Sequence, residues 1–596
     1  MPSMTFHKTL SGVILAGGVT ALLVGFISAS PFLNGNLFIK KWAAAGFTGI
    51  YSLFLFGILC WKKYGMIIRI RITDIIILCL FLIYWYFSLL DPKNSLGIPL
   101  YLMLLFMACR MISYHMDAQK IKALAGYFPA MVRITIGIHI LIVILQRFSF
   151  FPALHGYFNN GSTFGNPDML GAYIGVLLPM SFYNKRQIRN YWPYVTGIAA
   201  IMLLIIIQAR SALVALTVVG IIWLLRNKSI PWWAMVIIVM LFIALLVLLI
   251  YWHPGSLSGR IFVWFISLVM MKENPLGWGL YAFDRHYLEA QASYLAKNPG
   301  ITTLFSPDIV HSPFNEFLNI GVSLGIPGLL LYILLIIFLL HKAYRYGSLL
   351  IYPLMVFLII SLTYFPFKIM PVMILIVPMT AILAGQSKPL MDRRISAAGK
   401  NVVLVLLMLC SVSLILHAAQ MYQNHNKWEQ AVRMSQHPHL ESRAQKLFSE
   451  LYPKMKTHGR FLITYAGLEY HKGEYAEALK LLEEARRYFC DVSLALKLAR
   501  LYEQTGHFDQ AEKHYDLAVN IAPQRFNAHF EKLLFLVRIN EYKQAYQECI
   551  KLYNKPIQET AYADAYIIKK RVIEMIRQYE ENGTMEKIKK RGRTIQ

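Results

Sequence analysis

A histidine stands where a polar stretch of this chain meets a long apolar one. His311 opens HSPFNEFLNIGVSLGIPG, and Asn315 follows four residues later. Imidazole titrates near neutral pH, so a histidine at the mouth of a membrane span could take a proton from an acceptor hydroxyl. A surface histidine with a local hydrogen bond is the simpler alternative. Asn315 lies one helical turn on, where it either orients the ring or caps a helix.

Three arginines lie at similar boundaries. Arg210, in IIIQARSALVAL, separates two apolar segments with almost no loop between them. Arg260 opens the amphipathic stretch GRIFVWFISLVMM, and Arg147 ends another apolar segment. A guanidinium fixed at a membrane face binds phosphate oxygens in bidentate fashion. The alternative is that these side chains only extend toward lipid headgroups.

The sequence lacks the motifs of several other functional classes. HSPFNE is not HExxH, and none of the six cysteines forms a CxxC pair, so the sequence predicts no metal site and no cofactor. There is no Walker A motif, and the apolar segments are nearly free of Asp and Glu. Ion-coupled transporters usually keep carboxylates in their pathway. These absences argue against a pump.

The composition of the rest of the chain, which must position these histidine and arginine side chains, is that of a membrane protein. The chain has 596 residues, 57% of them hydrophobic, and a mean hydropathy of +0.47. Segments such as 233–252 are long enough to cross a hydrocarbon core of about 30 Å as helices. We therefore expect an all-α polytopic membrane protein of about 12–13 transmembrane helices. The expected spans lie near 9–30, 43–61, 72–90, 96–113, 127–148, 167–183, 193–208, 211–225, 232–252, 320–341, 348–365, 369–386 and 401–419.

The net charge of +27 comes largely from basic loops that orient the spans, so it does not indicate a nucleic-acid-binding protein. Alternating the spans brings the basic loops to one side, which the positive-inside rule makes cytoplasmic. The N-terminus is then cytoplasmic, and the external side holds the loop 253–319, the turn at Arg210 and everything after residue 419. The basic loops carry Lys62, Lys63, Arg69, Arg71, Lys185, Arg186, Arg189, Arg226, Lys228, Lys342, Arg345, Lys388, Arg393, Arg394 and Lys400.

The region 420–596 is charged and repetitive. GEYAEAL (473–479), GHFDQAE (506–512) and NEYKQAY (540–546) place Ala478, Ala511 and Ala545 at intervals of 33 and 34 residues, with Pro523 at a repeat end. This is the tetratricopeptide period of two helices per repeat. We predict a helical repeat domain, with repeats over roughly 458–560, after a transmembrane domain of residues 1–419. The repeats hold no catalytic cluster and offer a surface for a protein partner.

The stretch GSTFGNPDMLGAY (161–173) precedes the sixth expected span. Its glycines and proline allow a tight entry into a helix. Asn166 or Asp168 is expected to cap that helix.

Four stretches, in this order, resemble the superfamily of O-antigen ligases, Wzy-type polymerases and bacterial O-oligosaccharyltransferases. They are GSTFGNPDMLGAY, QARSALVAL, the pair GRIFVW and NPLGWGLYAF, and HSPFNEFLNIGVSLGIPG. The resemblance covers roughly residues 10–420, and the repeats are an appendage that some members carry. Asp168 departs from the pattern, which more often has Asn there.

The resemblance implies a GT-C-like glycosyltransferase of the bacterial inner membrane, with no nucleotide sugar and no metal. The donor would be a glycan on undecaprenyl pyrophosphate, and the acceptor a lipid A–core sugar, a protein Ser/Thr or another glycan repeat unit. His311 would be the base, and Arg210 and Arg260 would bind the pyrophosphate. Asn315 and Arg147 would have supporting roles. The transfer would invert the anomeric centre, with the repeats in the periplasm.

Two other classes stay open. A polymerase of the Wzy type differs from a ligase only in its acceptor. The first of the other classes is a non-catalytic transporter of lipid-linked sugars, against which the scarcity of charge in the apolar segments and the external histidine and arginines count. The second is a membrane-anchored scaffold acting through its repeats, which would not need the residues of loop 253–319.

Overall fold

The computed structural model describes residues 37–60, 66–90, 97–113, 128–150, 161–182, 191–226, 254–298, 312–385, 388–557 and 563–582, with a few isolated positions between 231 and 310. Two compact units divide the chain. The first takes Met1–His253 and Phe314–Gln430, and the second takes Pro254–Pro313 and Ala431–Gln596. The predicted domain boundary at residue 419 falls within one continuous helix, and most of the predicted external loop belongs to the second unit.

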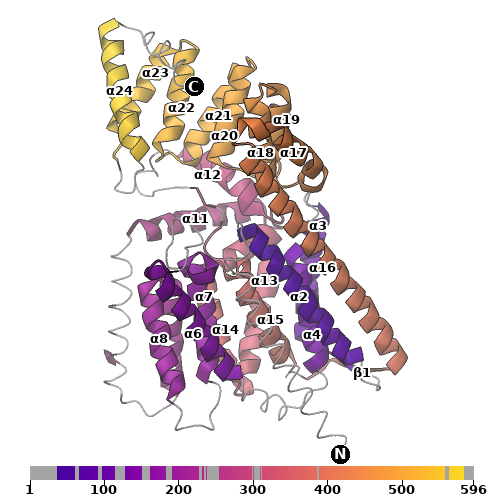
Figure 1. Ribbon diagram of the computed structural model, residues 1–596. Coiled ribbons are helices and arrows are strands. Elements are labelled where there is room, and N and C mark those ends of the chain that lie inside the picture. The colour runs from indigo at the N-terminus through magenta and orange to yellow at the C-terminus, as the bar shows by residue number, and fades with distance from the viewer. Residues whose placement is uncertain are drawn as a thin grey trace, which may run out of the picture. The chain divides into compact units, whose positions relative to one another are not determined.

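The first unit consists mainly of helices (Figure 1). Four helices of the described part are long and apolar enough to cross a membrane: Ile72–Leu90, Pro129–Arg147, Glu316–Arg345 and Ala397–Met434. The elements are α2 (Leu37–Cys60), α3 (Ile72–Leu90), α4 (Gly97–Ser113), α6 (Phe128–Arg147), α7 (Pro167–Leu177), α8 (Trp192–Ile206), α9 (Arg210–Arg226), α13 (Glu316–Arg345), α14 (Ile351–Ser361), α15 (Met370–Ala384) and α16 (Ala397–Met434).

The all-α class is confirmed, and each of these helices overlaps a predicted span. Buried side chains of α6, α7, α8, α9, α14 and α15 form one core, which includes Leu170, Tyr173, Leu204 and Ile360. Large apolar side chains remain exposed on the outer faces, such as Ile134, Ile198 and Leu406 at about 60%. An exposed apolar face of this extent suits lipid rather than water. The predicted span 9–30 and most of 232–252 lie outside the described residues, so the full count stays a prediction.

A small strand pair is an exception that the sequence did not suggest. β1 (Met66–Ile70) pairs antiparallel with β2 (Met391–Ile395), with Met66 opposite Ile395. Both strands come from basic loops predicted to share one side of the membrane. Their pairing brings these two basic segments together within the first unit.

The second unit holds two groups of helices. From the loop come α11 (Pro254–Glu273), a short π-helix (Phe283–Tyr287) and α12 (Leu288–Lys297). The repeat region is an α-solenoid, in which small residues such as Ala478, Ala511 and Ala545 are fully buried where helices meet. Its helices are α17 (Glu441–Met455), α18 (Gly459–His471), α19 (Tyr475–Arg486), α20 (Val492–Gln504), α21 (Phe508–Ile521), α22 (Phe526–Arg538), α23 (Tyr542–Asn554) and α24 (Ala563–Asn582).

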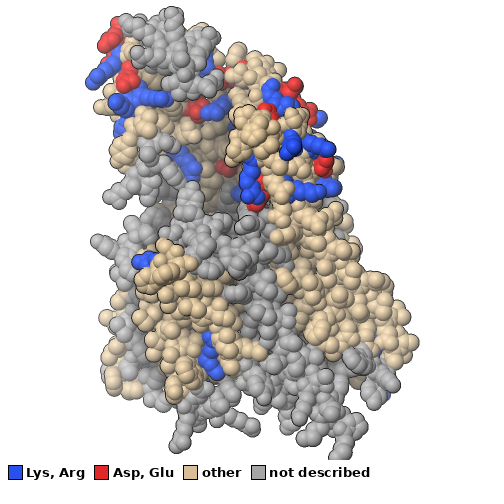
Figure 2. Space-filling model, in the orientation of Figure 1, with Lys and Arg blue, Asp and Glu red and all other residues tan. Residues whose placement is uncertain are grey.

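Charged side chains gather on these repeats, whereas the visible helices of the first unit carry few (Figure 2). The contrast is the one expected between a surface in water and a surface in lipid.

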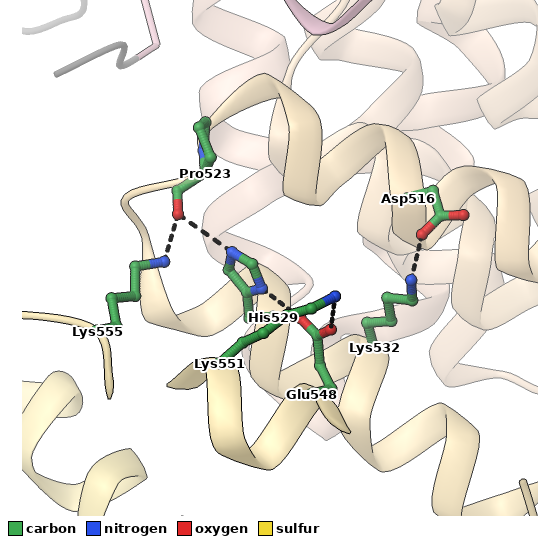
Figure 3. Close-up of polar contacts among 7 residues, drawn as sticks. All are labelled: Asp516, Pro523, His529, Lys532, Glu548, Lys551 and Lys555. Atoms are coloured by element: carbon green, nitrogen blue, oxygen red, sulfur yellow. Dashed lines mark hydrogen bonds and ion pairs between the residues drawn. The ribbon is translucent and has the colours of Figure 1, made fainter. Parts of the chain in front are cut away.

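One polar cluster joins the last two repeats (Figure 3). His529 Nδ1 lies 2.5 Å from Glu548 Oε1, and its Nε2 lies 3.1 Å from the Pro523 carbonyl oxygen. Glu548 and the Pro523 carbonyl thus engage both ring nitrogens of His529. Lys551 donates to the other Glu548 oxygen at 3.0 Å, and Lys555 donates to the Pro523 carbonyl. The proline that ends a repeat is therefore tied to the following helix pair.

This cluster predicts acid sensitivity of the repeats. Burial raises the pKa of Glu548, but the hydrogen bonds and charges of His529 and Lys551 outweigh it and lower that pKa to about 2. A carboxyl whose folded pKa lies below its unfolded value stabilises above the unfolded value of about 4.3 and loses that contribution as the pH falls toward 2. A Glu548→Gln variant should lose about 2–3 kcal/mol of repeat stability at pH 6.

Buried Cys549 reports this stability through its modification by dithiodipyridine, read by mass spectrometry. It should react roughly tenfold faster or more in the variant at pH 6, and the two rates should converge as the pH falls from about 4 toward 2. Exposed Glu541, changed to Gln, is the matched control. Equal rates for Glu548→Gln and the wild type at pH 6 would contradict the prediction.

Candidate functional site

Arg210 is the first residue of α9, and its side chain is half-buried. The turn before it needs a left-handed residue, Gln208, with φ of 56°. Ala209 follows, 1% exposed. Arg210 therefore stands at the positive dipole end of α9, which favours an anion there.

The start of α7 packs against this turn. Asn166 caps α7, its Oδ1 accepting from the N–H groups of Asp168 at 2.8 Å and Met169 at 3.2 Å. The predicted cap is thus confirmed for Asn166. A Cβ on Gly171 would lie 2.3 Å from the Ala209 Cβ, so only glycine lets α7 approach so closely. Any larger residue at 171 would displace the residue that precedes Arg210.

A second segment, Thr363–Lys368, links the start of α9 to the start of α13. Thr363 Oγ1 donates to Ser211 Oγ at 3.0 Å. At the other end of the segment, the Phe367 N–H donates to Glu316 Oε1 at 2.9 Å. Phe365 also contacts Phe314, with ring centroids 5.7 Å apart. The starts of α7, α9 and α13 thus meet at one polar end of the first unit.

Asn315 caps α13. Its Oδ1 accepts from the N–H groups of Phe317 at 2.9 Å and Leu318 at 3.2 Å. Of the two roles that the sequence left open, the structure shows the cap. Further along, Gly325 has φ of 72° and ψ of −178°, so α13 is kinked two residues before Pro327. Glycine is the residue that adopts this backbone without strain.

Glu316 is a residue of the site that the sequence analysis missed. It is fully buried, and its second oxygen accepts from Asn319 Nδ2 at 3.0 Å. Both carboxylate oxygens are thus engaged inside the fold, which fixes α13 to the Thr363–Lys368 segment. Its only signal in the sequence was a carboxylate at the start of an apolar span.

Left-handed backbone recurs at this end. Non-glycine residues with positive φ are Ser149 after α6, Ser162 before α7, Gln208 before α9 and Phe314 before α13. Each such residue costs on the order of 1 kcal/mol or more and persists where packing enforces it, often at functional sites. The helix starts are therefore held in strained, specific positions.

Arg260 lies in the second unit, half-buried on α11. One turn later, Trp264 Nε1 donates to the Pro313 carbonyl at 2.8 Å, so α11 runs beside the end of the segment 309–313. The stretch NPLGWGLYAF forms tight turns with positive φ at Gly277, Gly279 and Tyr281. Trp278 Nε1 donates to the Met270 carbonyl at 2.8 Å and ties these turns to α11.

The remaining predicted residues are placed as follows. Arg147 is the last residue of α6 and is exposed. His311 lies outside the described residues. No group of three metal-binding side chains occurs among the residues that the structure describes.

Comparisons with known proteins match two regions of the chain. Residues 195–333 match the family model described as O-Antigen ligase, and residues 470–534 match one described as Tetratricopeptide repeat. No curated protein matches the chain. Among solved structures, the chain is similar to one described as "Crystal structure of APC/C hetero-tetramer Cut9-Hcn1", with 11% identity over 90% of each chain and a TM-score of 0.21. At that TM-score the likeness says nothing about how the helices are arranged.

Proposed function

We propose that this protein transfers a glycan from undecaprenyl pyrophosphate to an acceptor hydroxyl at the periplasmic face of the bacterial inner membrane. The observation that carries the proposal is the match of residues 195–333 to the O-antigen ligase family. That range includes Arg210, Arg260, His311 and Asn315. A membrane protein of this family acts on lipid-linked glycans, and the apolar helices of the first unit suit such a donor.

In the proposed reaction, His311 takes the proton of the acceptor hydroxyl. The hydroxyl oxygen attacks the anomeric carbon of the donor from the face opposite the pyrophosphate. The bond between that carbon and the pyrophosphate oxygen breaks, and the anomeric centre inverts. The base contributes roughly a hundredfold or more to the rate.

Arg210 and Arg260 bind the pyrophosphate and neutralise the charge that builds on it as it leaves. A preorganised cation in a poorly solvated site stabilises such a charge by a few kcal/mol. The half-buried Arg210 at the start of α9 supports this role, because the helix dipole favours the same anion. Asn315 contributes by fixing the start of α13, four residues after His311, and exposed Arg147 is left a supporting role at most.

The acceptor is a lipid A–core sugar or a protein Ser/Thr. The family match favours the first, and the repeats, which commonly bind proteins, favour the second. A Wzy-type polymerase is the alternative within the same chemistry. A lipid-linked sugar transporter or a scaffold acting through its repeats is the alternative outside it. The paired basic loops at β1 and β2 agree with a cytoplasmic N-terminus and a periplasmic repeat domain.

Deleting the gene and comparing lipopolysaccharide ladders with glycoprotein profiles tests the proposal. Loss of the ladder with a normal glycoprotein profile identifies lipid A–core as the acceptor, and the reverse identifies protein. Lipid A–core that carries only one glycan repeat unit identifies a polymerase. Normal ladders and profiles would contradict a transferase, and the wild-type gene supplied in trans is the control.

A further inference from the structure

The loop helix α12 is part of the repeat unit, not a free connection between membrane spans. It packs against α21. Its apolar side chains and those of the preceding π-helix are buried: Phe283, Tyr287, Leu288, Ala292 and Leu295 are each at most 4% exposed. A segment that buries its whole apolar face in this way has its position set by the repeats.

Gln291 is the polar anchor of this contact. It is fully buried, its Oε1 accepts from the Tyr287 hydroxyl at 2.9 Å, and its Nε2 donates to the Ile521 carbonyl at 2.7 Å. A carbonyl only accepts, so the orientation of the amide is fixed. Ile521 ends α21, and its carbonyl has no partner within its own helix. Gln291 therefore caps a repeat helix from the loop.

A second contact joins the two main chains. The Cys490 N–H, between α19 and α20, donates to the Asp284 carbonyl of the π-helix at 2.8 Å. The turn between α19 and α20 and the end of α21 thus both hold the loop.

The same helix contacts the one that carries Arg260. Phe265 of α11 meets Tyr294 of α12 edge to face, with centroids 5.2 Å apart. Phe265 lies just over one turn after Arg260, and Tyr294 lies one turn after Gln291. Packed side chains therefore connect the Ile521 carbonyl of the repeats to the Arg260 helix.

We propose that Gln291 is a positioning residue, which holds Arg260 where it binds the donor diphosphate and so makes the repeats part of the donor site. The inference rests on the proposed function. Its specific claim is that the effect of Gln291 on donor affinity passes through Arg260 and not through Arg210.

A double-mutant cycle tests this in the full-length protein, with undecaprenyl pyrophosphate as the probe and its Kd measured by thermophoresis. Gln291→Met keeps the length of the side chain and removes both hydrogen bonds. It should raise the Kd about tenfold in the wild type and in Arg210→Ala, and less than about twofold in Arg260→Ala. Tyr287→Phe, which removes only the orienting hydroxyl, should raise the Kd about threefold.

Gln544→Met, on an exposed face of α23, is the matched control and should leave the Kd unchanged. Protection of buried Cys490 from thiol reagents shows that a variant is folded. If Gln291→Met exposes Cys490, Tyr287→Phe takes its place in the double-mutant cycle. Equal effects of Gln291→Met in the Arg260→Ala and wild-type proteins would overturn the inference alone, as would a silent Gln291→Met. Normal binding by Arg260→Ala would overturn the proposed role of Arg260 and this inference with it.

Discussion

A His311→Ala variant loses glycan transfer by a factor of about a hundred or more and keeps its affinity for undecaprenyl pyrophosphate. The loss follows because the other ionisable group in HSPFNEF, Glu316, is buried with both carboxylate oxygens engaged inside the fold. Affinity should be kept because the proposed mechanism assigns binding of the carrier to Arg210 and Arg260. The measurement is transfer from a purified lipid-linked glycan in membranes, beside the Kd for the free carrier.

His471→Ala is the control for this variant, since His471 is an exposed histidine of the repeats. It should transfer at the wild-type rate. Near-normal transfer by an inserted His311→Ala protein would remove His311 from the mechanism. Loss of carrier binding along with transfer would give His311 a role in holding the donor instead.

An Arg210→Ala variant should lose both donor affinity and turnover, with a fall in kcat/KM of roughly 10²–10³-fold. In the proposed reaction its guanidinium meets the anion at the start of α9, so its removal would leave the departing charge without a partner. Arg210→Lys should recover only part of the activity, because an ammonium cannot bind two oxygens in the planar geometry of a guanidinium.

The same helix provides the control. Arg226 ends α9 as Arg210 begins it, and it is exposed with its guanidinium 5.3 Å from the centroid of the Tyr344 ring. Arg226→Ala changes the net charge equally and removes an arginine from the opposite end. Similar losses in both variants would mean that Arg210 acts through general charge or stability.

Features encoded by neighbouring residues could be predicted from the sequence. Apolar length predicted the helices, Asn166 before Pro167 predicted a cap, and the 33–34-residue interval predicted the repeats, whose Pro523 ends a helix pair as expected. Each of these signals lies within one or two turns of the residue it explains, or recurs at a fixed period.

Features that depend on distant partners could not be predicted. Glu316 is buried because the Phe367 N–H reaches it from 51 residues away. Gln291 looks like an ordinary polar residue of an amphipathic helix until the Ile521 carbonyl, 230 residues on, is placed beside it. The packing of the loop helix α12 against α21 could not be predicted for the same reason, because the sequence of the loop carries no signal for the repeat helix that it contacts.

The pairing of β1 with β2 has a consequence for biogenesis. Residues 70 and 391 are 321 positions apart (391 − 70), and at a synthesis rate of about 5–20 residues per second β2 leaves the ribosome roughly 16–64 s after β1. During that interval the edge of β1 remains without its partner strand. Assembly of this protein in the membrane is therefore completed only late in translation, and chains truncated before residue 391 would leave that edge open to aggregation and to quality-control proteases.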